Sequence, residues 1–114
     1  MNDPTKYFGR MNAPVASAWL KGACGDEMEF YLDIFDNIVK TVKFHTENGC
    51  FDTVAAGAKT AELAEGRTVL EALRISPAQV IDELCGELPE EGRHCAILAV
   101  STLYKAIADY LLQP

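Results

Sequence analysis

Hydrophobic and polar residues alternate along the first half of the chain. Over Glu27–Phe35 every second residue is apolar, which is the period of a strand with one buried face. Asp36-Asn37 follows, and because both residue types tolerate positive φ, the pair predicts a tight hairpin turn into a partner strand over residues 38–46. Residues 15–21 are expected to add a third antiparallel strand. The buried face of the partner strand is predicted to carry Ile38, Val42 and Phe44, with Lys40 as an interruption.

The hydrophobic period changes from two to about 3.6 residues after Cys50, which predicts helices in the second half. A first helix is expected to start at Cys50 and to end at Gly66, since glycine adopts the left-handed conformation that follows many helices. Two short helices are expected to begin at Thr68, in a capping-box pattern, and at Ser76, which precedes a proline. A longer helix is predicted over residues 94–112, with an apolar face that packs on the sheet.

Strands followed by helices are typical of an α+β fold. We therefore predict a three-stranded antiparallel sheet with the helices packed on one face. A chain of 114 residues, 49% of them hydrophobic and 24% charged, is globular and long enough for one compact core but not for two. Residues 1–114 are accordingly expected to form a single domain, with a short, mobile N-terminal arm over about residues 1–13.

The balance of charge and hydrophobicity excludes several classes of partner. The chain holds 10 Lys and Arg against 17 Asp and Glu, a formal net charge of -7, and such a field repels phosphate backbones and anionic lipids. Neither nucleic acid nor a membrane is therefore an expected partner. No apolar run reaches the roughly 20 residues that cross a bilayer, and the first ten residues lack the basic and apolar regions of a signal peptide. A cytoplasmic location is expected.

Three of the four cysteines stand where predicted elements begin or end. In a chain without a secretion signal, cysteines favour metal or redox chemistry over disulfides. Cys24 lies between glycines two residues before Asp26, whereas Cys50 and Cys95, the latter beside His94, begin predicted helices. Because the dipole of a helix start favours thiolate over thiol, all three cysteines are expected to deprotonate easily.

These five side chains would meet if the strand ends and helix starts lie at the same end of the sheet. Thiolates with one nitrogen or carboxylate suit Zn²⁺ or an iron–sulfur cluster, whereas hard cations need more oxygen. The spacing contains no CxxC pair, so judged alone Cys95 is also compatible with packing in the core and Cys50 with an inert helix start, whereas Cys24 between glycines is hard to explain as packing. A Cys–His nucleophile pair is a further alternative. Cys85, on an apolar helix face, is predicted to be a buried structural thiol, and His45 a surface residue.

Three short motifs occur in a distinctive order: CGDEM at residues 24–28, GC at residues 49–50 and HCAILA at residues 94–99. Together with the Leu88-Pro89 pair and the sequence AIADY at residues 106–110, they resemble the IscU/NifU N-terminal family of iron–sulfur cluster assembly scaffolds. The resemblance extends over about residues 13–110. It implies an α+β fold with the ligands at one exposed tip.

The resemblance also implies a function and a set of ligands. Cys24, Cys50 and Cys95 would receive sulfide from a cysteine desulfurase, bind iron, hold a transient [2Fe-2S] cluster and pass it to apo-proteins, without the turnover of an enzyme. Asp26 matches a family aspartate that is a ligand or eases cluster release, and His94 matches an alternative fourth ligand. Many members bind Zn²⁺ at this site. Two alternatives of the same fold are a zinc-bound, SufU-like sulfur-transfer protein and a diverged domain with a purely structural zinc.

The chain departs from the family pattern at two places near these ligands. After the middle cysteine the family continues with small residues and serines, whereas this chain has Phe51 and Asp52. Their bulk and negative charge are expected to raise the pKa of Cys50 or to change which partners can approach. Where bacterial members carry an LPPVK-type chaperone segment, this chain has LPEEG, with Gly92 in place of the lysine. This replacement argues against chaperone-assisted release through the segment.

Overall fold

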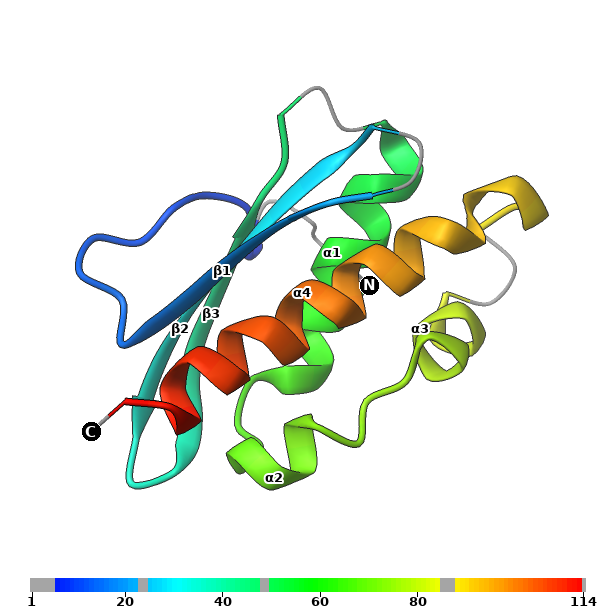
Figure 1. The fold of residues 1–114 in the computed structure, drawn as a ribbon. Coiled ribbons are helices and arrows are strands. Elements are labelled where there is room, and N and C mark those ends of the chain that lie inside the picture. Colours follow the sequence, from blue (N-terminus) through cyan, green and yellow to red (C-terminus); the bar gives the residue numbers. More distant parts are fainter. Residues whose placement is uncertain (1–5, 23–24, 48–49, 85–87, 114) are drawn as a thin grey trace.

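The computed structural model describes residues 6–22, 25–47, 50–84 and 88–113. The predictions made for Cys24 and Cys85 fall outside these residues. Strands precede helices along the chain, as the hydrophobic periods predicted (Figure 1). The elements are β1 (Ala16–Lys21), β2 (Glu27–Phe35), β3 (Ile38–His45), α1 (Phe51–Ala64), α2 (Val69–Ala72), α3 (Pro77–Glu83), the 3₁₀ turn η2 (Glu90–Gly92) and α4 (Arg93–Leu111).

The three strands form one antiparallel sheet in the order β1-β2-β3. Asp36 and Asn37 connect β2 to β3 with φ values of 56° and 61°. Two consecutive residues with positive φ give the turn whose twist matches an antiparallel hairpin, and Asp and Asn are among the few residues that accept it. The α+β class, the hairpin and the third strand are therefore confirmed.

A bulge in β3 changes which side chains are buried. Ile34 pairs with Val39 and Asp33 pairs with Thr41, so Lys40 has no partner across the sheet. An extra residue reverses the inward and outward alternation on either side of it. Val39 is consequently buried, whereas the sequence predicted Ile38 at that position of the core. That prediction is wrong because it assumed strict alternation of buried and exposed residues across the bulge.

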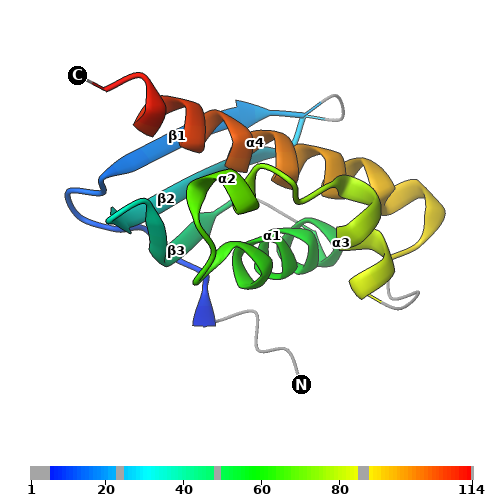
Figure 2. The ribbon, with the colours of Figure 1, turned by 90° about the horizontal axis from the view of Figure 1, so that it is seen from below.

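The helices cover one face of the sheet (Figure 2). Helix α4 packs along β1 and β2 and also against α1, while α1 packs on β3. Small residues of α1 allow a close approach at Gly57, where an added Cβ would lie 2.5 Å from a ring carbon of Phe44. The starts of α1 and α4 are thereby fixed relative to the sheet. Among the described residues, none of the helices combines the length and the apolar character needed to cross a membrane.

Local signals end and begin the helices where the sequence predicted. Gly66 follows α1 with φ 87°. The Thr68 hydroxyl accepts the Glu71 N–H while the Glu71 carboxylate accepts the Thr68 N–H, which completes the capping box of α2. Ser76 caps α3 in a similar manner by accepting the Gln79 N–H. These contacts stabilise helices that are otherwise too short to be stable.

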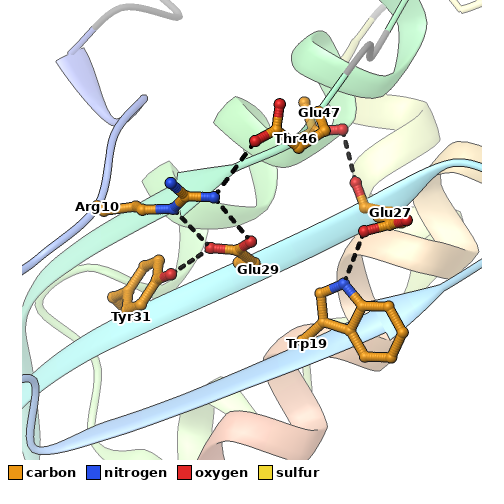
Figure 3. A network of polar contacts seen from close by, with 7 residues as sticks. All are labelled: Arg10, Trp19, Glu27, Glu29, Tyr31, Thr46 and Glu47. Carbon is orange, nitrogen blue, oxygen red and sulfur yellow. Dashed lines mark hydrogen bonds and ion pairs between the residues drawn. The ribbon is translucent and has the colours of Figure 1, made fainter.

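Residues 7–10 of the N-terminal arm contact the sheet, and the expected mobility of the arm stays a prediction. Tyr7 is buried, and Phe8 lies beside β3 with its ring 5.3 Å from that of Phe44. Arg10 reaches the uncovered face of the sheet, where its guanidinium donates to both carboxylate oxygens of Glu29 at 3.0 and 3.2 Å (Figure 3). The arm therefore extends the sheet edge instead of leaving the domain.

Candidate metal centre

Three predicted ligands come together at one end of the domain. Asp26 directly precedes β2, Cys50 is the N-cap of α1, and Cys95 is the third residue of α4. Their ligand atoms all lie within 4.8 Å of one another. A tight turn sets the position of Asp26, because the Gly22 N–H donates to the Asp26 carbonyl at 2.6 Å and Gly25 takes a φ of 94°.

A fourth side chain, the buried hydroxyl of Thr53, joins all three ligands. It donates to Asp26 Oδ2 at 2.7 Å and lies 3.4 Å from Cys50 Sγ and 3.5 Å from Cys95 Sγ. Sequence reasoning missed this residue. The available signal is the spacing, since the third residue of a helix points back to the cap, as in a capping box, and Thr53 has that relation to Cys50.

Cys50 is exposed, and its thiol ionises more easily than an ordinary cysteine thiol. The side chain of Thr53 lowers the pKa of Cys50 below its ordinary value, because its one hydroxyl proton can turn from Asp26 to the sulfur when Cys50 is a thiolate. The backbone N–H groups of Thr53 and Asp52, in the first turn of α1, act in the same direction. The expected easy deprotonation is confirmed for Cys50. The expectation that Phe51 and Asp52 raise the pKa of Cys50 is wrong, because the hydrogen bonds from Thr53 and from the Asp52 backbone outweigh burial and nearby charge. The alternative, that these two residues change which partners can approach, stays a prediction.

Cys95, by contrast, is buried, and its thiol ionises less easily than an ordinary cysteine thiol. Only 1% of the residue is exposed, and burial raises the pKa of its thiol above the ordinary value despite the contact with Thr53. The nearby negative charges of Cys50, Asp26 and Asp52 raise it further. The prediction of easy deprotonation is therefore wrong for Cys95, because this helix start faces the core and the burial outweighs the helix dipole.

His94 lies at the edge of the site. Its Nε2 atom is 3.6 Å from Cys95 Sγ, and the side chain is exposed. It does not belong to the group of atoms that lie within 4.8 Å of one another. Within the described residues, the structure thus brings together Asp26, Cys50 and Cys95 and places His94 beside one of them.

The side chain of Asp52 lies close to Gly92. A Cβ added at Gly92 would lie 2.6 Å from Asp52 Oδ2 and 3.0 Å from its carboxylate carbon. The absence of a side chain at position 92 therefore leaves the room that the Asp52 carboxylate takes. Phe51, by contrast, is 69% exposed and points away from the core beside the site.

The donor set fits a soft or borderline metal. Two thiols and one carboxylate are typical ligands of zinc and iron, and hard cations such as Mg²⁺ prefer oxygen alone. In a tetrahedral site with bonds of about 2.0 to 2.3 Å, ligand atoms lie about 3.3 to 3.8 Å apart. A separation of at most 4.8 Å needs only a small contraction to reach this arrangement. The three side chains leave a coordination position for a further ligand.

Comparisons with known sequences identify relatives of this chain. The family of NifU-like N-terminal domains matches residues 2–114. An iron-sulfur cluster assembly scaffold protein, IscU 1 of Archaeoglobus fulgidus, is 40% identical over 87 residues, which are 76% of this chain and 56% of that protein. IscU of Haemophilus influenzae is 39% identical over 89 residues, or 77% of this chain and 68% of that protein. The chain thus spans little more than half the length of the archaeal relative.

Solved structures share the fold. A scaffold protein of the SUF system from Fervidobacterium islandicum superimposes with a TM-score of 0.73 at 21% identity, over 90% of this chain and 88% of that one. A NifU-like N-terminal protein from Brucella abortus gives a TM-score of 0.71 at 20% identity, over 96% and 88%. The family match over nearly the whole sequence agrees with the order of motifs, strands and helices. The chain belongs to the family of NifU-like N-terminal domains.

Proposed function

We propose that this protein is an iron–sulfur cluster assembly scaffold. It accepts sulfur from a cysteine desulfurase, binds iron, holds a transient [2Fe-2S] cluster and transfers it to apo-proteins. The observation that carries the proposal is the convergence of Asp26, Cys50 and Cys95 within 4.8 Å, in a chain 40% identical to a protein named as such a scaffold. Cys24, two residues before Asp26 in sequence, supplies a third thiolate in this proposal.

The two described thiols have different roles in this proposal. Cys50 is exposed and its pKa is lowered, so its thiolate attacks the terminal sulfur of a persulfide on the desulfurase. The bond to that sulfur forms on Cys50 while the persulfide S–S bond breaks, and the desulfurase cysteine leaves as a thiolate. Cys95 is buried and acts as an anchoring ligand.

The electrons needed for cluster formation come in part from a thiol reductant. Two transferred sulfur atoms need four electrons to become two sulfides. Two electrons come from the oxidation of two ferrous ions to ferric ions, and the other two come from a small-molecule or protein dithiol, which becomes a disulfide. The protein takes up sulfur and iron and gives up one finished cluster in stoichiometric amounts, so we propose that it acts as a carrier and not as an enzyme.

The mixed ligand set favours release of the cluster. A carboxylate from Asp26 or an imidazole from His94 is a more labile partner for iron than a further thiolate. Exposure of Cys50 and His94 leaves one side of the site open to an acceptor protein. With Gly92 in place of the family lysine, release in this proposal does not depend on chaperone recognition of the LPEEG segment.

Anaerobic reconstitution tests the proposal. The protein is incubated with ferrous iron, L-cysteine, a dithiol and a cysteine desulfurase, and visible absorption, iron and acid-labile sulfide are measured. We expect equal amounts of iron and sulfide, and loss of the absorption in Cys24→Ala, Cys50→Ala and Cys95→Ala. The matched control is Cys85→Ala, which should keep the cluster. Tightly held zinc with no cluster absorption in the wild-type protein contradicts the proposal and favours the zinc-bound sulfur-transfer alternative.

A further inference from the structure

We infer that Thr53 is a positioning residue, whose single hydroxyl holds Asp26, Cys50 and Cys95 in place for the incoming metal. The inference concerns how the proposed site is organised, and it rests on the proposed function only in that these three residues bind metal. Thr53 itself is not proposed as a ligand.

The first argument comes from the contacts of the hydroxyl. A threonine hydroxyl has one proton to donate and two lone pairs that accept. In this structure the proton goes to Asp26 Oδ2 at 2.7 Å, and the two sulfur atoms lie at 3.4 and 3.5 Å. All three contacts are therefore directed at the predicted ligands. Thr53 is fully buried, so bulk water does not compete for them.

The second argument comes from two other buried threonines in the helices. Thr60 and Thr102 are also fully buried, and each donates to the backbone carbonyl four residues earlier, at 2.8 and 2.7 Å. This is the usual way in which a helix satisfies a buried hydroxyl. Thr53 lies in the first turn of α1, so the residue four positions before it precedes the helix. Its hydroxyl is used by the site instead, where it connects three separate segments of the chain.

The third argument concerns what happens when the hydroxyl is absent. The three ligands come from the segment before β2, the start of α1 and the start of α4, so no local backbone geometry fixes their side chains relative to one another. Valine has nearly the same shape as threonine but cannot bond the Asp26 carboxylate. That carboxylate would turn away from the apolar methyl group, and metal binding would first have to bring it back. Loss of partners that orient ligands typically lowers metal affinity about 10- to 100-fold.

The test uses Zn²⁺ and Co²⁺ as probes of the apo-protein. Zn²⁺ affinity is measured by competition with a chelating dye, and Co²⁺ absorption reports tetrahedral geometry and thiolate ligation. We expect Thr53→Val to bind Zn²⁺ about 10- to 100-fold more weakly and to change the Co²⁺ spectrum. Thr53→Ser, which keeps the hydroxyl, should restore both. The matched controls Thr60→Val and Thr102→Val remove equally buried hydroxyls and should leave affinity and spectrum unchanged.

Two outcomes overturn the inference. One is a folded Thr53→Val protein with wild-type Zn²⁺ affinity and Co²⁺ spectrum, and the other is an equal loss of affinity in Thr60→Val. If Thr53→Val does not fold, Thr53→Ala is compared with Thr60→Ala by the same criteria. A wild-type protein that binds Zn²⁺ but never forms a cluster refutes the proposed function and leaves this inference standing. Cluster formation together with an unaffected Thr53→Val refutes the inference alone.

Discussion

Replacement of Gly57 by alanine tests whether the close contact between α1 and the sheet holds the site together. An alanine Cβ would lie 2.5 and 2.6 Å from two ring carbons of Phe44, where an ordinary contact is about 3.5 to 4.0 Å. The Phe44 ring is fully buried and has Phe8 and Phe30 as ring neighbours, which restrict its movement. The helix or the ring must therefore shift by about 1 Å to reach ordinary contact.

The free energy of unfolding should fall on balance. Overpacking a core costs about 1 to 3 kcal/mol, and the depth of this overlap places Gly57→Ala near the upper end. Alanine regains about 1 kcal/mol through its better helix propensity. We expect a net loss of about 1 to 2 kcal/mol, which lowers the melting temperature by about 4 to 8 °C in a domain of this size.

The assay is thermal unfolding by circular dichroism, combined with the Zn²⁺ titration. Because α1 carries both Cys50 and Thr53, an outward shift of the helix should also weaken Zn²⁺ binding. A double-mutant cycle with Phe44→Leu supplies the control, since removal of the ring carbons should make Gly57→Ala less harmful or stabilising. A melting temperature of Gly57→Ala equal to or above that of the wild type would refute the reasoning.

Three further predictions concern reactivity, pH and capping. In the apo-protein, iodoacetamide should modify Cys50 at lower pH and faster than Cys95, because Cys50 is exposed with a lowered pKa while burial raises the pKa of Cys95. Mass spectrometry after timed quenching measures both rates, and equal rates would contradict this prediction. Arg10 lowers the pKa of Glu29, so their contact adds stability at neutral pH that is lost as Glu29 becomes protonated below about pH 4.5. Arg10→Ala should therefore flatten the dependence of melting temperature on pH in this acidic range, and an unchanged dependence would contradict the assignment. Thr68→Ala removes a capping contact and should cost about 1 kcal/mol in chemical denaturation without altering Zn²⁺ affinity; a loss of affinity would link α2 to the site.

The sequence was sufficient for the order and type of the elements because their signals are local. The alternation over Glu27–Phe35, the Asp36-Asn37 turn and the Thr68 capping box each act through neighbouring residues. The bulge at Lys40 could not be predicted in the same way. It is defined by pairing with β2, and residues 38–46 alone contain only a polar interruption of the apolar face.

The sequence predicted that Asp26, Cys50 and Cys95 lie close together but not how their side chains are organised, and metal binding by the five predicted residues stays a prediction. Motifs named Asp26, Cys50 and Cys95 as ligands, and the structure places their ligand atoms together. Two helix starts nevertheless differ in electrostatics, because Cys50 faces outward while Cys95 is covered by the core, and burial is a property of the whole fold. The role of Thr53 was not predicted, because it depends on contacts with Asp26 and Cys95, which are 27 and 42 positions away in the sequence.

Because Asp52 lies against Gly92, we expect the effects of substitutions at these two positions to depend on each other. If Gly92 were replaced by lysine, the first carbon of that side chain would lie 2.6 Å from Asp52 Oδ2 in its present position. A side chain at position 92 would therefore displace the Asp52 carboxylate from its present position. Reversion of one residue is therefore a different experiment from reversion of both. The two positions form a structurally coupled pair, because the space that a side chain at position 92 would need is the space that the Asp52 carboxylate fills.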